Sequence, residues 1–296
     1  MRDERGVILS SEQLRTFQIN LLEIMVEVDR ICRRNGIYYS LDGGTLLGAI
    51  RHKGFIPWDD DADIIFTRTE YEKFYLACYE ELDQKRFFLQ DYRTDPEYRW
   101  GYAKLRRKGT EFVRLGQEKL KYRTGMTIDI FVLDNVPDGK ICRDVYYGVN
   151  YSLRKILYSD MGRFAAKQLV LRLWYRLLHL VPKNACFLLR NWFIKFFANK
   201  RTKLLSHLLF QYPASCISKY GVPAKWFEVY QDIVFEGFTF YAVREADSYL
   251  KYLYGDYMKM PPEAERVPRP LASCIEMLPL QIEDVRKIYN EGLFEA

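Results

Sequence analysis

The sequence lacks the patterns that most often fix a protein's class at first sight. Its 296 residues include six cysteines and only three histidines. No two cysteines form a C-x-x-C pair, and no histidine lies at metal-ligand spacing from a cysteine, so no Cys–His metal motif is present. Single cysteines scattered through apolar patterns are typical of reduced core thiols in an intracellular protein.

Long apolar runs, repeats and low-complexity tracts are missing too. The N-terminal MRDERGVILSSEQLR has no apolar signal core, which predicts a cytoplasmic protein. The most apolar stretches, residues 164–181 and 186–200, contain Lys and Arg too often for a membrane span. With 49% hydrophobic and 28% charged residues, the composition is that of a globular protein with a full core.

Positive charge is concentrated in one segment. Residues 140–203 hold fourteen Lys and Arg but only the acids Asp144 and Asp160, a balance of +12, whereas the whole chain carries +6. Residues 141–210 are predicted to be mostly helical, and the basic segment also contains Trp174 and Trp192. Two interpretations remain open: a basic amphipathic surface for an anionic membrane, or a subdomain whose apolar faces pack together. The large apolar residues argue against nucleic-acid binding.

An acidic cluster is the most informative motif. Residues 55–66, FIPWDDDADIIF, hold Asp59, Asp60, Asp61 and Asp63 directly before β-prone apolar residues. Such crowding of carboxylates costs free energy unless a cation neutralises it, and hard oxygen ligands suit Mg²⁺ or Mn²⁺. In an extended segment, residues two apart point to the same face, so Asp61 and Asp63 could share a metal. The alternative is a solvated acidic loop.

A glycine turn precedes this cluster. A predicted strand, residues 37–41, leads into Gly43-Gly44-Thr45 and a short helical stretch, residues 46–50. Paired glycines let a backbone approach a phosphate, and the start of a helix offers free N–H groups to an anion. The alternative is an ordinary turn. Positive charge in the same region comes from Arg51, His52 and Lys53.

A third acid and two cations lie further along the chain. Asp129 stands among apolar residues in a predicted strand, residues 126–132, where it could bind metal or accept the proton of an attacking hydroxyl. Alternatively, it lies on the solvated face of an edge strand. On the predicted strand 100–107, Lys104 and Arg106 share one face, where either could meet a donor phosphate or simply face solvent.

The remaining pattern predicts the scaffold. Apolar residues recur with helical periodicity through residues 11–34, which predicts a helix, and Ser10 with Gln13 forms a potential capping box. Thr69 and Glu72 suggest a second capping box, opening a helix to about residue 82. Asp134 is interpreted as a turn residue. Further expected elements are a strand at 87–90, a hairpin at 233–243 turning at Glu236-Gly237, and a helix at 246–254.

Three blocks together resemble a known family. GGTLLGAIRHKGFIPWDDDADIIF resembles the signature of the LicD family, which is related to the fukutin-type glycan phosphotransferases of the nucleotidyltransferase superfamily. IDIFVLD resembles the family's second block, and residues 235–262 resemble its C-terminal block. The resemblance implies an α+β fold, a nucleotidyltransferase-like mixed β-sheet flanked by helices, here with an additional basic, aromatic helical segment.

The resemblance also implies an activity. It is that of a transferase moving a substituted phosphate from a CDP-linked donor, most often CDP-choline, onto a hydroxyl of a cell-surface glycan or its lipid-linked precursor, with release of CMP. Asp61 and Asp63 match the metal pair, with Asp59 beside them, and Asp129 matches the third acid. Gly43, Gly44 and Thr45 match the glycine turn. Quaternary ammonium recognition requires aromatic rings; the candidates are Trp58, Trp100, Tyr252, Tyr254 and Tyr257.

Two departures from the family pattern stand out. Ala62 replaces a larger aliphatic residue between the paired acids, which affects packing. After the YGDY block, where many members have a histidine, this chain has Arg266-Val267-Pro268-Arg269, which leaves a C-terminal contact to substrate or metal open.

The sequence suggests three parts: residues 1–139 as the catalytic core, 140–210 as a helical insertion at a membrane or acceptor, and 211–296 completing the catalytic domain. The expected location is the cytoplasm, peripheral at the inner face of the membrane. Two other functions remain open, a nucleotidyltransferase that moves NMP and releases pyrophosphate, and a non-catalytic membrane-associated scaffold.

Overall fold

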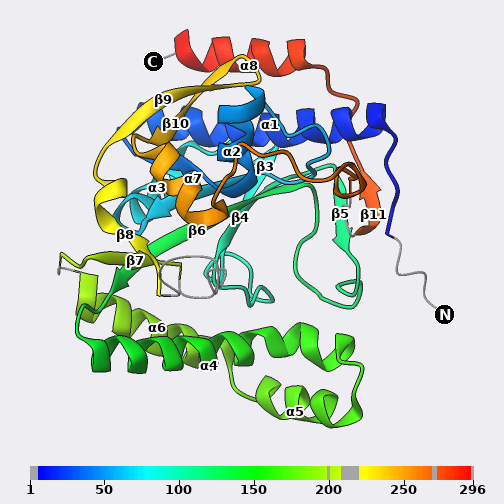
Figure 1. Ribbon diagram of the computed structural model, residues 1–296. Coiled ribbons are helices and arrows are strands. Elements are labelled where there is room, and N and C mark those ends of the chain that lie inside the picture. The colour runs from blue at the N-terminus through cyan, green and yellow to red at the C-terminus, as the bar shows by residue number, and fades with distance from the viewer. Residues whose placement is uncertain (1–5, 199–200, 208–219, 269–271, 295–296) are drawn as a thin grey trace.

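The computed structural model describes residues 6–198, 201–207, 220–268 and 272–294; Cys216 and Arg269 lie outside the described residues. At its centre is a seven-stranded sheet (Figure 1). Its strands are β1 (Ser40–Leu41), β2 (Asp63–Thr67), β3 (Phe87–Gln90), β4 (Ala103–Arg107), β6 (Thr127–Val136), β7 (Leu204–Ser206) and β8 (Val222–Pro223).

The sheet is mixed, and β6 is its axis. The order is β1-β2-β6-β4-β3, while β7 pairs with the end of β6 and β8 with β7. Only β2 and β6 are parallel; the other neighbours in this sheet are antiparallel. The side chains of Ile64, Ile65 and Phe66 are fully buried, as expected for a central strand covered on both faces.

Helices flank the sheet, and two small two-stranded sheets complete the fold. The small sheets are the hairpin β9 (Tyr230–Phe235) and β10 (Phe238–Val243), and β5 (Glu111–Arg114) with β11 (Ala272–Glu276). The helices are α1 (Ser11–Arg34), α2 (Gly43–His52), α3 (Arg68–Glu81), α4 (Lys140–Ala165), α5 (Leu169–His179), α6 (Lys183–Ala198), α7 (Ala246–Tyr254) and α8 (Ile282–Phe294), with 3₁₀ turns at Ala224–Phe227 and Glu263–Glu265.

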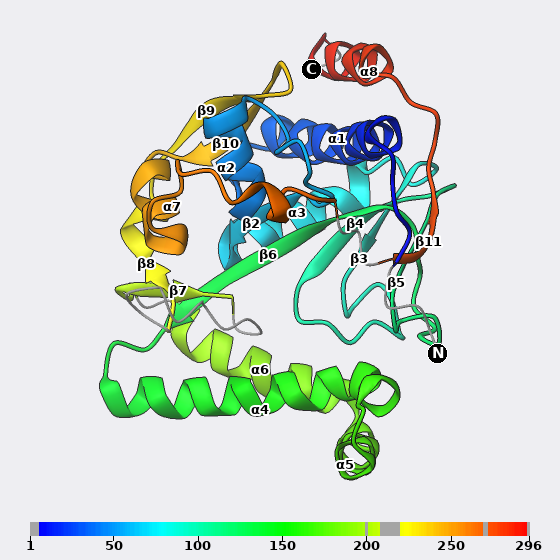
Figure 2. The same cartoon turned by 45° about the vertical axis from the view of Figure 1, so that its right-hand side comes forward.

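The main core lies between α1 and the sheet. The N-terminus of α1 is closed by the predicted capping box, in which Gln13 N–H donates to Ser10 Oγ at 3.2 Å and Ser10 N–H donates to Gln13 Oε1 at 2.9 Å. Leu22, Ile24 and Met25 are fully buried. The helices α4–α6, here called the helical arm, lie on the opposite side of the sheet from α1 (Figures 1 and 2). No helix in the described part of the chain is long and apolar enough to cross a membrane.

Most of the predicted scaffold is confirmed. The sheet is mixed and flanked by helices, α1 has the predicted bounds, and the hairpin turns at Glu236 and Gly237. The segment 140–198 is helical apart from short links, as predicted, and α7 ends at Gly255. The predicted strands at 37–41 and 100–107 are shorter in the structure.

Three local predictions are wrong. Helix α3 is capped by Thr67, which accepts from the Glu70 N–H, and not by Thr69. Asp134 is no turn residue but a buried member of β6, paired with Arg68 at 2.6 Å. Leu204–Ser206, inside the segment predicted to be mostly helical, form β7, because their backbone completes the ladder at the end of β6.

Candidate active site

The sheet itself brings two distant acids together. In the parallel pair of β2 and β6, Asp63 lies directly beside Asp129, and the Asp129 N–H donates to Ala62 O at 3.0 Å. Neighbouring strands lie about 4.8 Å apart, so the two carboxylates share one local environment. Asp61 precedes β2 by two residues and is exposed at the surface. The structure thus gathers the three predicted acids at one end of two central strands.

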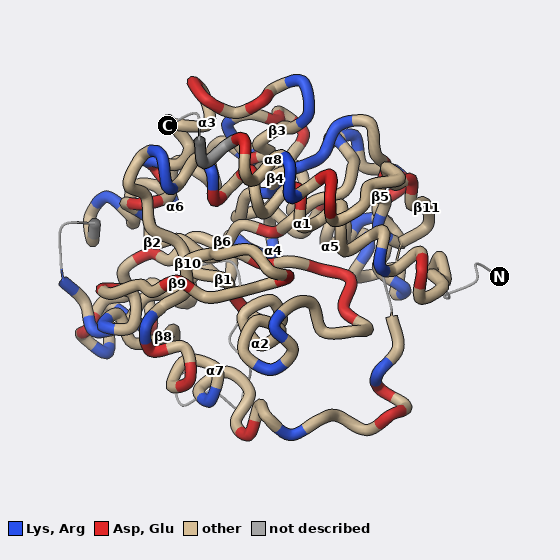
Figure 3. The backbone as a smooth tube through the Cα atoms, turned by 90° about the horizontal axis from the view of Figure 1, so that it is seen from above, with Lys and Arg blue, Asp and Glu red and all other residues tan. Residues whose placement is uncertain are grey.

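The glycine turn lies against the same acids. Gly43 opens α2 with φ +50°, and a Cβ there would lie 3.2 Å from Asp63 Oδ2. A Cβ on Gly44 would lie 2.9 Å from Asp59 Oδ2, closer than ordinary contacts allow. Thr45, which is buried, accepts from the Asp63 N–H at 2.9 Å and so fixes the turn to β2. Gly43 is favoured by its positive φ, a Cβ on Gly44 would press on the Asp59 side chain, and the acidic segment runs past α2 (Figure 3).

Mutual repulsion marks the acidic segment. Burial raises the pKa of Asp59 to about 8, and the charges of Asp61 and Asp60 add to the shift. Burial, followed by the charge of Asp129, raises the pKa of Asp61, although its outer edge meets solvent. Burial likewise raises the pKa of Asp63 well above its ordinary value, helped by Asp61 and Asp129. Carboxylates in such surroundings bind protons or cations strongly.

The charge balance fits a cation at this place, although the ligands are not pre-arranged around one. Within the described residues, no Lys or Arg forms an ion pair with Asp59, Asp61 or Asp63. No group of three or more His, Cys, Asp or Glu in the described ranges is arranged so that it could hold a metal ion as it stands. The donor set of carboxylate oxygens is nevertheless the type that Mg²⁺ and Mn²⁺ prefer.

Lys104 is the cation closest to this chemistry. It lies opposite Asp129 in the antiparallel pair of β4 and β6, and its ammonium forms an ion pair with the Asp129 carboxylate. Burial lowers the pKa of Lys104 to about 8, and Asp129 opposes this shift. Lys104 therefore touches the acid cluster itself, which its strand-face spacing alone did not indicate.

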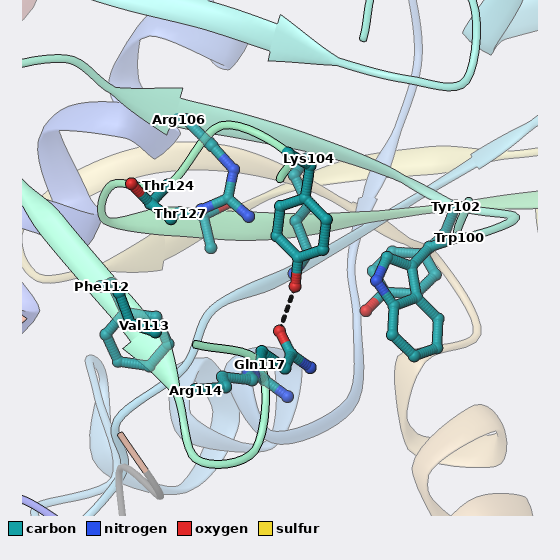
Figure 4. Close-up of a pocket in the computed structure, with 11 residues that line it drawn as sticks. Trp100, Tyr102, Lys104, Arg106, Phe112, Val113, Arg114, Gln117, Thr124 and Thr127 are labelled. Carbon is teal, nitrogen blue, oxygen red and sulfur yellow. Dashed lines mark hydrogen bonds between the residues drawn. The ribbon is translucent and has the colours of Figure 1, made fainter. Parts of the chain in front are cut away.

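A pocket adjoins the cluster (Figure 4). Arg106 lies on its sheet side, where it is buried and donates to Gln90 Oε1 and Gly125 O, both at 2.6 Å. Arg114 comes from the end of β5 on the opposite wall, with Trp100 and Tyr102 at one side (Figure 4). The lining residues are Trp100, Tyr102, Lys104, Arg106, Phe112, Val113, Arg114, Gln117, Tyr122, Thr124 and Thr127.

Arg114 is a site residue that the sequence analysis missed. Against the opposing effect of partial loss of hydration, the charges of Asp129, Tyr102 and Asp61 raise its pKa. Its side chain is exposed, and within the described residues no ion pair or hydrogen bond is found for its guanidinium. The alternation of the EFVR segment after the turn at Gly109 was the available signal for a strand there.

The other predicted binding residues lie at the far end of α2. Arg51, His52 and Lys53 follow the glycine turn by most of the ten-residue helix, about 12 Å along its axis. There Arg51 donates to Tyr257 O at 2.9 Å, and the His52 ring lies 6.2 Å from that of Trp58. The structure thus gathers this basic, aromatic group separately from the glycine turn. The Arg266 guanidinium joins it 5.9 Å from the Trp58 ring.

Of the candidate tyrosines, one borders the acids. The Tyr254 hydroxyl lies 3.5 Å from where a Gly43 Cβ would stand, and the side chain is 48% exposed. Tyr252 is buried and donates to Gly221 O at 2.7 Å, and Tyr257 donates to Asp247 at 2.8 Å, so these two support the local fold. Tyr254 is therefore the tyrosine best placed to touch a bound substrate.

The glycine turn, the paired acids and the third strand acid all lie in a segment that matches a known family. Residues 36–155 match the family described as LicD/FKTN/FKRP, nucleotidyltransferase domain. The chain belongs to the LicD family and is a LicD-like phosphotransferase, which confirms the resemblance.

The chain is 31% identical over 270 residues to the lipopolysaccharide cholinephosphotransferase LicD of Haemophilus influenzae, a match covering 86% of this chain and 95% of that protein. It is also 42% identical over 64 residues to an uncharacterized protein of Rickettsia prowazekii, covering 20% of this chain and 24% of that one. An uncharacterized protein of Rickettsia typhi is 41% identical over 66 residues, covering 20% and 21%.

Proposed function

We propose that this enzyme transfers phosphocholine from CDP-choline onto a hydroxyl of lipopolysaccharide, or of a related cell-surface glycan or its lipid-linked precursor, and releases CMP. The observation that carries the proposal is Asp63 beside Asp129 on adjacent parallel strands, with the Gly43 turn against them. The cholinephosphotransferase activity in the name of the Haemophilus relative supports the choice of phosphocholine. We propose also that the mixed sheet is of the nucleotidyltransferase type. The chain would then consist of a catalytic core (residues 1–139), a helical insertion (140–210) and a part that completes the catalytic domain (211–296).

We further propose that Asp59, Asp61, Asp63 and Asp129 hold a divalent cation, Mg²⁺ or Mn²⁺. The chemistry of the donor set fits these ions. Crowding and burial raise the pKa values of Asp59, Asp61 and Asp63, and hard oxygen donors suit both Mg²⁺ and Mn²⁺. When bound, such a cation neutralises negative charge on the phosphates of the donor.

The chain's own residues would position the two reactants. Backbone N–H groups of the Gly43–Thr45 turn, at the N-terminus of α2, receive the donor pyrophosphate. Asp129 orients the acceptor hydroxyl and takes its proton as the new oxygen–phosphorus bond forms and the bond to CMP breaks. Lys104, paired with Asp129, holds that carboxylate in place. Arg114 contributes positive charge beside the transferred phosphoryl group.

The test is CMP release from CDP-choline by Asp63→Asn. We expect loss of at least 10³-fold in kcat with an unchanged far-UV circular dichroism spectrum, because electrostatic positioning carries most of such a reaction. Glu80→Gln, an exposed carboxylate on α3, serves as the matched control and should keep full activity. Substantial metal-dependent turnover by folded Asp63→Asn would refute the assignment.

Two alternatives make different predictions in the same assays. Transfer of NMP would release pyrophosphate instead of CMP. A scaffold would show no Mg²⁺-dependent binding of CDP-choline by isothermal titration calorimetry. We place the enzyme in the cytoplasm, peripheral at the inner face of the membrane, where a lipid-linked acceptor is accessible; the positive balance of residues 140–203 supports this location.

A further inference from the structure

Helix α5 exposes its apolar face to solvent, the reverse of an ordinary surface helix. None of its residues is buried, and its large apolar side chains face outward. They recur at spacings of three and four, so they lie on one helical face. The exposed fractions are 66% for Leu169, 76% for Val170, 48% for Leu173, 55% for Trp174, 59% for Leu177 and 77% for Leu180. These six residues form what we call the outer face of α5.

Three polar side chains of α5 point toward the protein instead. Arg172, Tyr175 and His179 repeat at the same helical spacing but are only partly exposed. The Arg172 guanidinium donates to Ala166 O at 3.1 Å, and His179 Nδ1 lies 3.9 Å from Asp160 Oδ1. The Tyr175 ring packs closely over Gly162 of α4: a Cβ added to Gly162 would lie 2.5 Å from the nearest ring atoms.

The orientation of α5 is therefore fixed by contacts, not by a loose linkage. Among the described elements, α4 is the one it packs against most extensively, and both ribbon views place α5 at the edge of the molecule farthest from α1 (Figures 1 and 2). A soluble helix with its polar face inward and its apolar face in water gains nothing from the hydrophobic effect. Such an arrangement indicates a surface covered in the functional state.

The next helix in the chain, α6, also exposes large apolar side chains. On α6, Leu188 is 71% exposed, Trp192 60% and Phe196 57%, while the opposite side of α6 is buried against α4 and the end of β6. Trp174 and Trp192 thus both lie in the exposed part of the helical arm. Tryptophan is enriched where a membrane interface offers both an apolar and a polar environment.

Charge selects the occupant of this surface. From residue 161 to residue 203 the sequence contains no Asp or Glu, and the segment 140–203 has a balance of +12. A second copy of this chain would bring the same positive charge to the contact, so self-association through the arm is disfavoured. An anionic bilayer attracts such a segment and also takes up apolar side chains at the depth of its headgroups. Arg176, exposed beside the outer face, is placed to meet lipid phosphates.

We propose that the outer face of α5 is a membrane-docking surface that inserts into the interface of an anionic lipid bilayer. The proposal deepens the peripheral location proposed above and rests on it only for its biological purpose. Docking through α5 would hold the catalytic sheet beside a lipid-linked acceptor without any spanning helix.

The experiment is co-sedimentation of the full chain with sucrose-loaded vesicles, without donor or acceptor. Vesicles of mixed phosphatidylglycerol and phosphatidylcholine are compared with vesicles of phosphatidylcholine alone. We expect at least tenfold stronger partitioning to the anionic vesicles, falling with salt. The variant Leu173→Glu/Leu177→Glu should lose at least tenfold in partitioning, and Arg176→Glu should show a smaller loss.

The matched control is Leu76→Glu, a leucine on α3 that is 66% exposed and should bind vesicles like the wild type. Because all these side chains are exposed, the variants should fold, which circular dichroism and CMP release with a water-soluble acceptor can verify. Equal binding of wild type and double variant would overturn the proposal, as would equal binding to neutral vesicles. Failure to bind any vesicle, with a dimer that the double variant converts to monomer, would assign the face to a second copy instead. None of these outcomes bears on the proposed transfer.

Discussion

Gly44→Ala tests the glycine turn with the smallest possible change. The added methyl group keeps the backbone N–H that would face a donor phosphate, but its Cβ would lie 2.9 Å from Asp59 Oδ2. An ordinary contact begins at 3.4 Å, so the Asp59 carboxylate must retreat by about 0.5 Å. A misplacement of 1 Å in an active site can cost about 10²-fold in rate, so we expect roughly a tenfold loss in kcat/KM for CDP-choline.

Stability should change little in the same variant. Alanine is better than glycine in a helix by about 1 kcal/mol, and the close contact offsets part of that gain. With about 0.6 kcal/mol/K of unfolding entropy for a chain of this length, the melting temperature should stay within about 2 °C of the wild type. The expected signature is therefore a damaged site in an intact fold.

Gly148→Ala is the matched control for this experiment. Gly148 lies inside α4, and a Cβ there would meet nothing within 4 Å. The substitution should raise the melting temperature by about 2 °C and leave CMP release unchanged. If Gly44→Ala keeps the wild-type kcat/KM, the position of Asp59 against the turn has no role in catalysis and the proposed metal set loses this member.

Two further predictions concern the scaffold that holds the site. Asp134 is 1% exposed and lies between Arg68 and Arg190. Changing it to Asn should lower the free energy of unfolding by about 3 kcal/mol, because two guanidinium groups lose their charged partner. Urea denaturation measures this change, and a loss below about 1 kcal/mol would contradict the prediction. Burial raises the pKa of Asp29 to about 6, against the opposing charge of Arg33. The folded state therefore binds the Asp29 proton more tightly than the unfolded state does. The stability that this proton contributes is complete below about pH 4 and is lost as pH rises through about 6. Asp29→Asn should therefore reduce the fall in unfolding free energy between pH 4 and pH 6.5 by about 1–3 kcal/mol, and an unchanged slope would refute the reasoning.

Local patterns in the sequence predicted the parts of the site that depend on one segment. The Ser10 capping box, the glycine turn and the acidic run before β2 all depend on residues a few positions apart. Asp129 was predicted as a third acid because an acid among apolar strand residues needs a partner, but its position beside Asp63 depends on which strands pair. That pairing is a property of the whole sheet.

The residues that sequence reasoning missed or misplaced depend on tertiary contacts. Arg114 reaches the pocket from β5 only because β5 pairs with β11, some 160 positions later, and the EFVR segment alone gives no such indication. Asp134 resembles a turn residue after an apolar strand, until Arg68 and Arg190 neutralise it in the interior. Thr67 and Thr69 are equally good caps by type, and the end of β2 decides between them.

The excursion of the chain through α4–α6 begins and ends at one point. Val136, the last residue of β6, pairs with Leu204, the first of β7, so the two ends of this long loop lie only about 5 Å apart. The hydrogen-bond ladder between β6 and β7 therefore does not depend on the length of the chain between them. The contacts of α6 with β6, such as Arg190 with Asp134, must be kept, but α5 packs mainly on α4 and can change without altering strand register, so a different surface at α5 would leave the chemistry as it is.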